Sequence, residues 1–150
     1  MSSYPDWWNY TVTVYNKYED HATRLTSWYR KVITGCYWSG STLQILKQDF
    51  AVETDSAMCR IPKQDNYVDK ASWNNLSDDD KLIHLTFAPG DIVALGTVTD
   101  EIDDFPTEST TSIQSTAFLK KYANTSFVVK NFTDNSNDYK GSQHYCVRGV

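Results

Sequence analysis

Apolar and polar residues alternate along several short stretches of the chain, a pattern typical of β-strands that are buried on one face. In YTVTVYNKY (residues 10–18) the valines alternate with threonine and tyrosine, and LTSWYRKVI (residues 25–33) is rich in β-branched and aromatic residues. A polar connection separates the two stretches. They predict a β-hairpin from Thr11 to about Val32, and the glycines at positions 35 and 40 predict an interruption after it.

Further strands are predicted in the second part of the chain. SAMCRIP (residues 56–62) alternates and ends at a proline, which has no amide hydrogen to donate to a neighbouring strand. PGD (residues 89–91) is a turn signal ahead of the apolar stretch IVAL (residues 92–95). TSFVVKNF and QHYCVRGV then predict a closing hairpin at residues 125–132 and 143–150.

The chain shows a helical pattern only briefly. TSIQSTAFLKKY (residues 111–122) predicts one short α-helix, with a threonine or serine at 110–112 as its cap and two lysines at its C-terminal end. The polar stretch 63–81 predicts a loop with one helical turn near Ser72, and residues 39–56 predict an extended loop or hairpin. We therefore expect a single all-β, mainly antiparallel domain over residues 1–150, a small β-barrel or sandwich with long loops. Residues 1–9 are a candidate N-terminal arm.

Composition narrows the functional classes. The net charge is −5 and lysine and arginine are spread thinly, which excludes the basic surface typical of nucleic-acid binding. The chain has no run of 18 apolar residues and no signal-peptide pattern at its start, so we expect no membrane contact and synthesis in a cytoplasm. Three cysteines without metal-type spacing, Cys36, Cys59 and Cys146, predict reduced and at least partly buried thiols.

The stretch DEIDD (residues 100–104) gathers four carboxylates and raises the question of an acidic catalytic or metal site. A glycosidase pair needs two carboxyl groups that face each other across a sugar, whereas these are chain neighbours. A calcium loop of the EF-hand type needs a central glycine and alternating ligands, and TDEIDDFPTEST lacks both the glycine and the spacing. The pattern favours a solvated acidic edge or a charged contact surface.

Other candidate chemistry is scattered along the chain. His144 and Cys146 fall on one side of a predicted strand, but thiol catalysis also needs an orienting group and an oxyanion hole. The three histidines lack zinc-site spacing, and no phosphate-binding glycine loop occurs. We therefore expect no enzyme activity, no catalytic, cofactor-binding or metal-binding residue, and no cofactor. A small hydrolase that uses His144 and Cys146 is one alternative.

The aromatic residues offer an alternative of another class, a carbohydrate-binding β module. Flat rings stack on sugars, and six aromatic residues are available for such a platform: Trp7, Trp8, Tyr10, Tyr29, Tyr37 and Trp38. Aromatic residues are equally typical of contacts between proteins. Both readings of these rings stay open at this point.

Five stretches follow one another along most of the chain: TVTVYNKYED (residues 11–20), SWYRKVITGCYW (27–38), CRIP (59–62), GDIVALGTVTDEI (90–102) and HYCVRGV (144–150). Their order and spacing resemble a family of small structural proteins from tailed phages and prophages of Gram-positive bacteria. These are the minor capsid or head-tail joining proteins, encoded beside the capsid and connector genes.

The resemblance implies a virion protein at the head-tail interface, made in the bacterial host cytoplasm. It implies a stopper, or head-completion subunit, in a hexameric or dodecameric ring that closes the portal channel over packaged DNA and receives the tail. The implied partners are portal or adaptor proteins above, tail proteins below and, by proximity, the packaged DNA. An adaptor or tail-terminator subunit is the alternative within the same assembly.

In such a ring, contacts between subunits close by rotation. Two tandem tryptophans cannot both face one side of a strand, so one of them is expected to dock on another chain. The acidic stretch is expected to meet lysine or arginine of a neighbour or to line the channel. The candidate inter-subunit contacts are therefore Trp7, Trp8, Arg30, Asp100, Glu101, Asp103 and Asp104.

Overall fold

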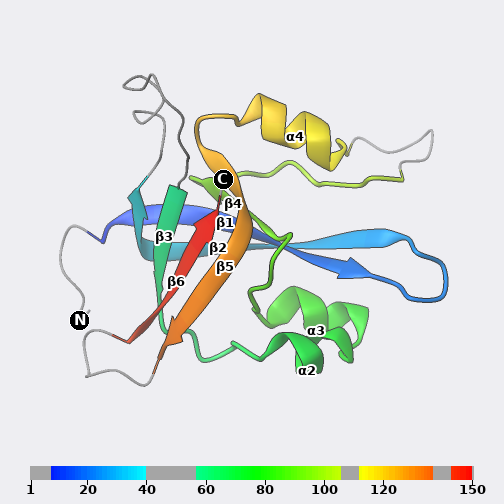
Figure 1. Ribbon diagram of the computed structural model, residues 1–150, viewed down its shortest axis with the longest axis horizontal. Helices are drawn as coiled ribbons and strands as arrows, with labels where there is room; N and C mark the ends of the chain where they lie inside the picture. The colour runs from blue at the N-terminus through cyan, green and yellow to red at the C-terminus, as the bar shows by residue number, and fades with distance from the viewer. Residues whose placement is uncertain (1–7, 40–56, 106–111, 137–142, 150) are drawn as a thin grey trace.

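The strands of the chain close into a β-barrel, in the order β1-β2-β3-β6-β5-β4, and every neighbouring pair is antiparallel (Figure 1). The structure is a computed structural model and describes residues 8–39, 57–105, 112–136 and 143–149. The expected all-β, mainly antiparallel fold is confirmed, and it is a barrel. Its strands are β1 (Tyr10–Glu19), β2 (Thr26–Ser39), β3 (Ala57–Pro62), β4 (Ile92–Leu95), β5 (Ser126–Asn135) and β6 (His144–Gly149).

The first two strands form the predicted hairpin, but β2 does not stop at the glycine. It continues through Gly35 to Ser39. The pairing register shifts here, because Tyr10 and Val12 of β1 pair with Cys36 and Ile33 of β2. Gly35 has a φ of 75°, which other residues rarely adopt. The glycine therefore makes a bulge that bends the strand, and the predicted interruption at this position is wrong.

This hairpin is longer than the barrel and projects from it (Figure 1). β4 pairs with β1 only along residues 12–15, and β3 pairs with β2 only along residues 37–39. Residues 16–19 and 26–29, which pair with each other beyond the end of β4, are therefore a two-stranded ribbon outside the continuous ladder of the barrel. Alternate side chains of the ribbon point to its two opposite faces.

Two separate hydrophobic clusters hold the fold together. One takes side chains from all six strands and fills the barrel; Val12, Cys59 and Val147 are among its fully buried members. The other lies between the hairpin and helix α4 (Ser115–Lys121), where the rings of Tyr15 and Phe118 meet edge to face at 5.0 Å. The second cluster fastens one face of the ribbon to the rest of the chain.

The helices differ from the sequence prediction in number and position. The described residues contain α2 (Lys70–Asn74) and α3 (Asp78–Ile83) in addition to α4, so the expectation of one short helix is wrong. α2 replaces the predicted single turn, and α3 lies in a stretch predicted as loop. α4 begins at Ser115 without a capping side chain from its own N-cap residue, so the predicted cap at 110–112 is also wrong.

Two expectations fall mainly outside the described residues. The candidate N-terminal arm, residues 1–9, is described only for its last two positions. The extended loop or hairpin expected at residues 39–56 is described only for Ser39, the last residue of β2.

Candidate interaction surface on the projecting hairpin

The acidic segment, residues 100–104, lies against the hairpin and bonds within its own chain. Glu101 Oε2 lies 3.0 Å from both Nε and Nη2 of Arg30 on β2. This pairing of an acidic residue with an arginine, which we expected between subunits, forms inside one chain. The Asp103 carboxylate accepts a hydrogen bond from the amide of Phe105 at 2.9 Å, in a local turn.

Asp100 joins the same segment to the end of α4. Its Oδ2 accepts from Lys121 Nζ at 2.8 Å and from the hydroxyl of Tyr122 at 2.7 Å. The bond from Lys121 holds the pKa of Asp100 below its usual range, and Asp100 in turn raises the pKa of Lys121. The backbone carbonyl of Asp100 also accepts from the Tyr15 hydroxyl at 2.6 Å.

Asp104 connects the hairpin to the start of α4. Its Oδ2 accepts from Trp28 Nε1 at 3.0 Å, and its Oδ1 accepts from the amide and hydroxyl of Ser115 at 2.7 and 2.8 Å. Burial acts to raise the pKa of Asp104, but the bonds from Ser115 and Trp28 outweigh it and the pKa lies below its usual range. Asp104 thus caps α4 from outside the helix, 11 residues before Ser115.

The opposite face of the hairpin contains a buried polar network that the sequence analysis missed. The Asp91 carboxylate, fully buried, accepts from the amides of Lys17 and Ala88 at 2.9 and 3.0 Å and from Asn16 Nδ2 at 3.0 Å. Asn16 Oδ1 accepts from Lys31 Nζ at 2.8 Å. Burial raises the pKa of Asp91 to about 6 and lowers the pKa of Lys31 to about 7. The sequence gives no sign of this buried role, because an aspartate after Pro89 and Gly90 is fully accounted for by the turn.

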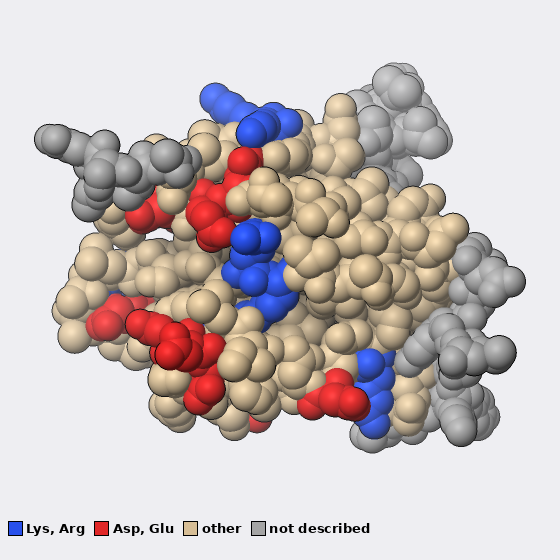
Figure 2. Space-filling view, turned by 180° about the vertical axis from the view of Figure 1, so that it is seen from behind, with Lys and Arg blue, Asp and Glu red and all other residues tan. Residues whose placement is uncertain are grey.

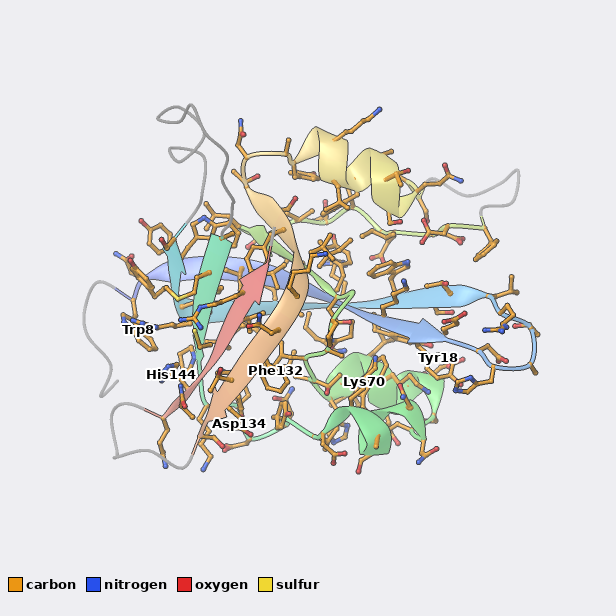
Figure 3. All side chains as sticks on the ribbon, viewed as in Figure 1. Trp8, Tyr18, Lys70, Phe132, Asp134 and His144 are labelled. Atoms are coloured by element: carbon orange, nitrogen blue, oxygen red, sulfur yellow. The ribbon has the colours of Figure 1, made fainter. Side chains whose placement is uncertain are left out.

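Trp73 of α2 is the centre of the contact between the helices and this face. Its ring is fully buried, and its Nε1 donates to the carbonyl of His84 at 3.0 Å. Two tyrosines of the hairpin meet its ring edge to face and three lysine ammonium groups lie over it: Tyr18 at 6.4 Å, Tyr29 at 5.4 Å, Lys31 at 5.2 Å, Lys70 at 4.4 Å and Lys81 at 5.7 Å. Figure 3 labels Lys70 and Tyr18 in this region. The contacts that Tyr18, Tyr29 and Lys31 make with this ring fasten α2 to the hairpin.

Most of the described rings among the tandem tryptophans and the candidate sugar platform pack against other residues of the chain. Trp7 lies outside the described residues, and Trp8 is buried with its ring edge to face with His144 at 5.7 Å (Figure 3). Trp38 packs against Phe127 at 5.4 Å. Of the platform residues, Tyr10 is exposed, to 42 %. Of the five described rings of the platform, Trp8 and Tyr29 are buried, so these five do not form one exposed plane.

The three cysteines are free and buried, as expected. Burial raises the pKa of the Cys59 thiol well above its usual range, and Cys59 lies beside Cys36. A nucleophilic cysteine needs the opposite shift. Within the four described ranges, no three histidine, cysteine or carboxylate side chains are grouped so that they would hold a metal ion.

Comparison with known families gives one match. The profile of a family of unknown function (DUF6751) matches residues 7–150. The chain belongs to this family. No curated protein and no solved structure matches it. Since the match spans every described strand and helix, the barrel, the hairpin and its fastenings all lie within the DUF6751 region.

The charges of this DUF6751 protein are arranged in groups on the face shown in Figure 2, where basic side chains gather near the centre and acidic groups lie above and below them. Among the described helices, none combines the length and the apolar character that a membrane span requires.

Proposed function

We propose that the protein is a subunit of a tailed-phage head-tail connector, of the stopper or head-completion type. In the virion it would close the portal channel after DNA packaging and form the surface to which the tail attaches, as one member of a hexameric or dodecameric ring. Its partners would be portal or adaptor proteins and tail proteins. The five stretches of resemblance suggest this role, and DUF6751 membership carries no functional assignment of its own.

The projecting hairpin is the observation that supports this role best. A two-stranded hairpin is only marginally stable by itself in water. Here residues 16–19 and 26–29 extend beyond the barrel, and the chain fastens both of their faces, through Asp104 and Trp28 on one side and Trp73 on the other. A ribbon held rigid outside its barrel suits a subunit that docks on neighbours in a ring.

The candidate inter-subunit contacts now separate into two groups. Arg30, Asp100, Glu101 and Asp104 bond within the chain, so their loss would disturb the fold as well as an assembly contact. Within the described ranges the carboxylate of Asp103 bonds only to the amide of nearby Phe105, and the Phe105 side chain is 50 % exposed. Asp103 is therefore the acidic residue with which the contact role is best tested.

The test is disruption of the gene in a phage or prophage that carries it, followed by electron microscopy of the particles. A stopper predicts heads that have lost their DNA and carry no tails, and wild-type protein supplied in trans restores infectious particles. Full heads with overlong free tails would assign the protein to the tail terminator instead. Normal infectious particles without the protein would refute a connector role.

A charge reversal sharpens the same test. Asp103→Lys should lower the yield of infectious particles while the purified subunit unfolds at the wild-type temperature. Asp134→Lys on β5 is the matched control, since the Asp134 carboxylate, like that of Asp103, accepts from the backbone amide two residues along the chain. Equal yields from the two variants would remove Asp103 from the contact surface.

A further inference from the structure

Lys31 is a half-buried lysine whose amine donates to an uncharged acceptor. Its Nζ donates to Asn16 Oδ1 at 2.8 Å. Within the described ranges no carboxylate forms an ion pair with this nitrogen. Because removal from water penalises the charged form of a lysine, a site without a directly paired carboxylate favours the neutral amine.

The hydrogen bonds of Asn16 fix the direction of its amide. Its Nδ2 donates to the carbonyl of Thr86 at 2.6 Å and to Asp91 Oδ2 at 3.0 Å, so its oxygen faces Lys31. Asp91, the carboxylate of this network, therefore reaches Lys31 by way of the Asn16 amide. A neutral amine can donate one hydrogen to such an oxygen and keep its lone pair free.

Two further ammonium groups lie near the same ring as Lys31. Its Nζ is 5.2 Å from the centroid of the Trp73 ring, and those of Lys70 and Lys81 are 4.4 and 5.7 Å from it. Burial lowers the pKa of Lys31 to about 7; Asp91 acts in the opposite direction, and Lys70 adds to the lowering. About half of the Lys31 side chains are then neutral at pH 7, which is the nucleophilic form of an amine.

A pocket of about 220 Å³ lies beside Lys31, between β2 and the end of α3. Lys31 lines it on one side and Leu82 of α3 on the other. Arg30 also lines it, but its guanidinium is held by Glu101 and by the carbonyl of Val98. The other walls are apolar or amide side chains: Val32, Ile33, Gln64, Asn66 and Leu85. Such a pocket suits a small molecule without a net charge.

We propose that Lys31 is a nucleophilic amine that captures small neutral aldehydes from this pocket as an imine. The nitrogen lone pair forms a bond to the carbonyl carbon, whose double bond to oxygen opens. The two hydrogens of the amine and the carbonyl oxygen then leave as water, and the carbon–nitrogen double bond forms. The step needs no oxidant or reductant. This inference follows from the fold alone and does not require the virion role.

Reductive ethylation of the full-length protein at pH 7 tests the proposal. Acetaldehyde is the probe, cyanoborohydride reduces the imine to a stable ethylamine, and mass spectrometry of chymotryptic peptides gives the rate at each lysine. Lys31 should react about tenfold or more faster than Lys120, which is exposed on α4, because exposed lysines are almost wholly protonated at this pH. In denaturing urea the ratio of the two rates should fall to about one, since the unfolded chain exposes both lysines alike.

Two variants on α3 test the role of the pocket. Leu82 and Ile83 are 52 % and 58 % exposed, and of the two Leu82 lines the pocket. Leu82→Trp should fill the pocket and slow the reaction of Lys31 several-fold. Ile83→Trp is the matched control and should leave the rate at Lys31 as in the wild type. The rate at Lys120 should be unchanged in both variants.

Three results would overturn the proposal. If Lys31 reacted no faster than Lys120, it would not be a nucleophile of unusual reactivity. An unchanged rate at Lys31 in Leu82→Trp would show that the aldehyde does not enter through the pocket. The ratio of the Lys31 rate to the Lys120 rate should be smaller with glyoxylate, an aldehyde that carries a carboxylate; a larger ratio would rule out neutral aldehydes as the preferred class.

Discussion

The two faces of the projecting hairpin are fastened by different chemistry. On one face, carboxylates at the molecular surface hold the acidic segment to the ribbon and to α4; the side chains of Arg30 and Glu101 are 29 % and 56 % exposed. On the other face, Asp91 and Asn16 are fully buried and three lysines lie over the ring of Trp73. One face is held by exposed ion pairs and hydrogen bonds, called the clasps below, and the other is held by a buried polar network.

This difference sets how much each contact contributes to stability. Exposed ion pairs contribute little, because water and salt screen them and two long side chains must be ordered. A buried carboxylate is different, because its removal leaves donors and cations without a partner in a place water does not reach. We therefore expect the rigidity of the hairpin to depend on the buried face, while the exposed face determines where α4 and the acidic segment lie.

Asp91→Ala tests the buried face and should have the largest effect. It leaves the amides of Lys17 and Ala88 without an acceptor and removes one of the two acceptors of Asn16 Nδ2, beside buried lysines. We expect a loss of about 3–5 kcal/mol in the free energy of unfolding, measured by urea titration. Asp103→Ala, at an exposed turn, is the control and should change it by less than about 0.5 kcal/mol. Similar losses in both variants would contradict the comparison of the two faces.

Asp104→Ala should have an intermediate effect, because Asp104 is the most buried of the clasps. The substitution removes the acceptor of Trp28 Nε1 and the cap of α4 at Ser115. A lost cap and side-chain bond predict about 1–2 kcal/mol of destabilisation. Hydrogen exchange should quicken in α4 first, while the barrel strands keep their protection. Equal quickening throughout the barrel would show that the exposed face also supports the core.

Much of the barrel follows from the sequence because its signals are local. Alternation identified the hairpin, β3 and the closing strands, and the PGD turn located the start of β4. Helix α3 had a local signal too: Ser77 caps it through a bond to the Asp80 amide, and three acidic residues fill its first turn. The polar composition of this stretch predicts a loop, and the capping pattern is the signal that identifies the helix.

The contacts of the acidic residues have no local signal. The Asp104 carboxylate accepts hydrogen bonds from Ser115 and Trp28, and the Glu101 carboxylate accepts one from Arg30. Only the folded chain brings these residues together. The sequence shows that the stretch is charged, but it does not show whether the partners of these charges lie in the same chain or in another one. Asp91 illustrates the reverse problem, since a residue with a sufficient role in a turn conceals a second role in the core.

Lys31 makes the buried face sensitive to pH. Burial lowers its pKa from 10.5 to about 7 in the folded protein, so between these pH values the unfolded chain binds more protons than the folded one. The free energy of unfolding of the wild type should therefore increase relative to that of Lys31→Met as pH rises from 7 to 10, measured under reducing conditions. Comparing the two proteins cancels other titrating groups. Lys120→Met, on the exposed side of α4, is the control, and its difference in unfolding free energy from the wild type should not change with pH. A difference for Lys31→Met that also stayed constant with pH would show that Lys31 is not buried.

The smallest effect is expected from the Arg30–Glu101 pair on the exposed face. A double-mutant cycle with Arg30→Ala and Glu101→Ala should give a coupling of about 0.2–1 kcal/mol, because solvent reaches both side chains. High salt should reduce this coupling further, since the pair is open to counterions. A coupling energy as large as the loss of unfolding free energy expected for Asp91→Ala, and unchanged by salt, would mean that the exposed ion pair stabilises the hairpin as strongly as the buried network does. The contrast between the faces would then lie in their chemistry alone and not in their contribution to rigidity.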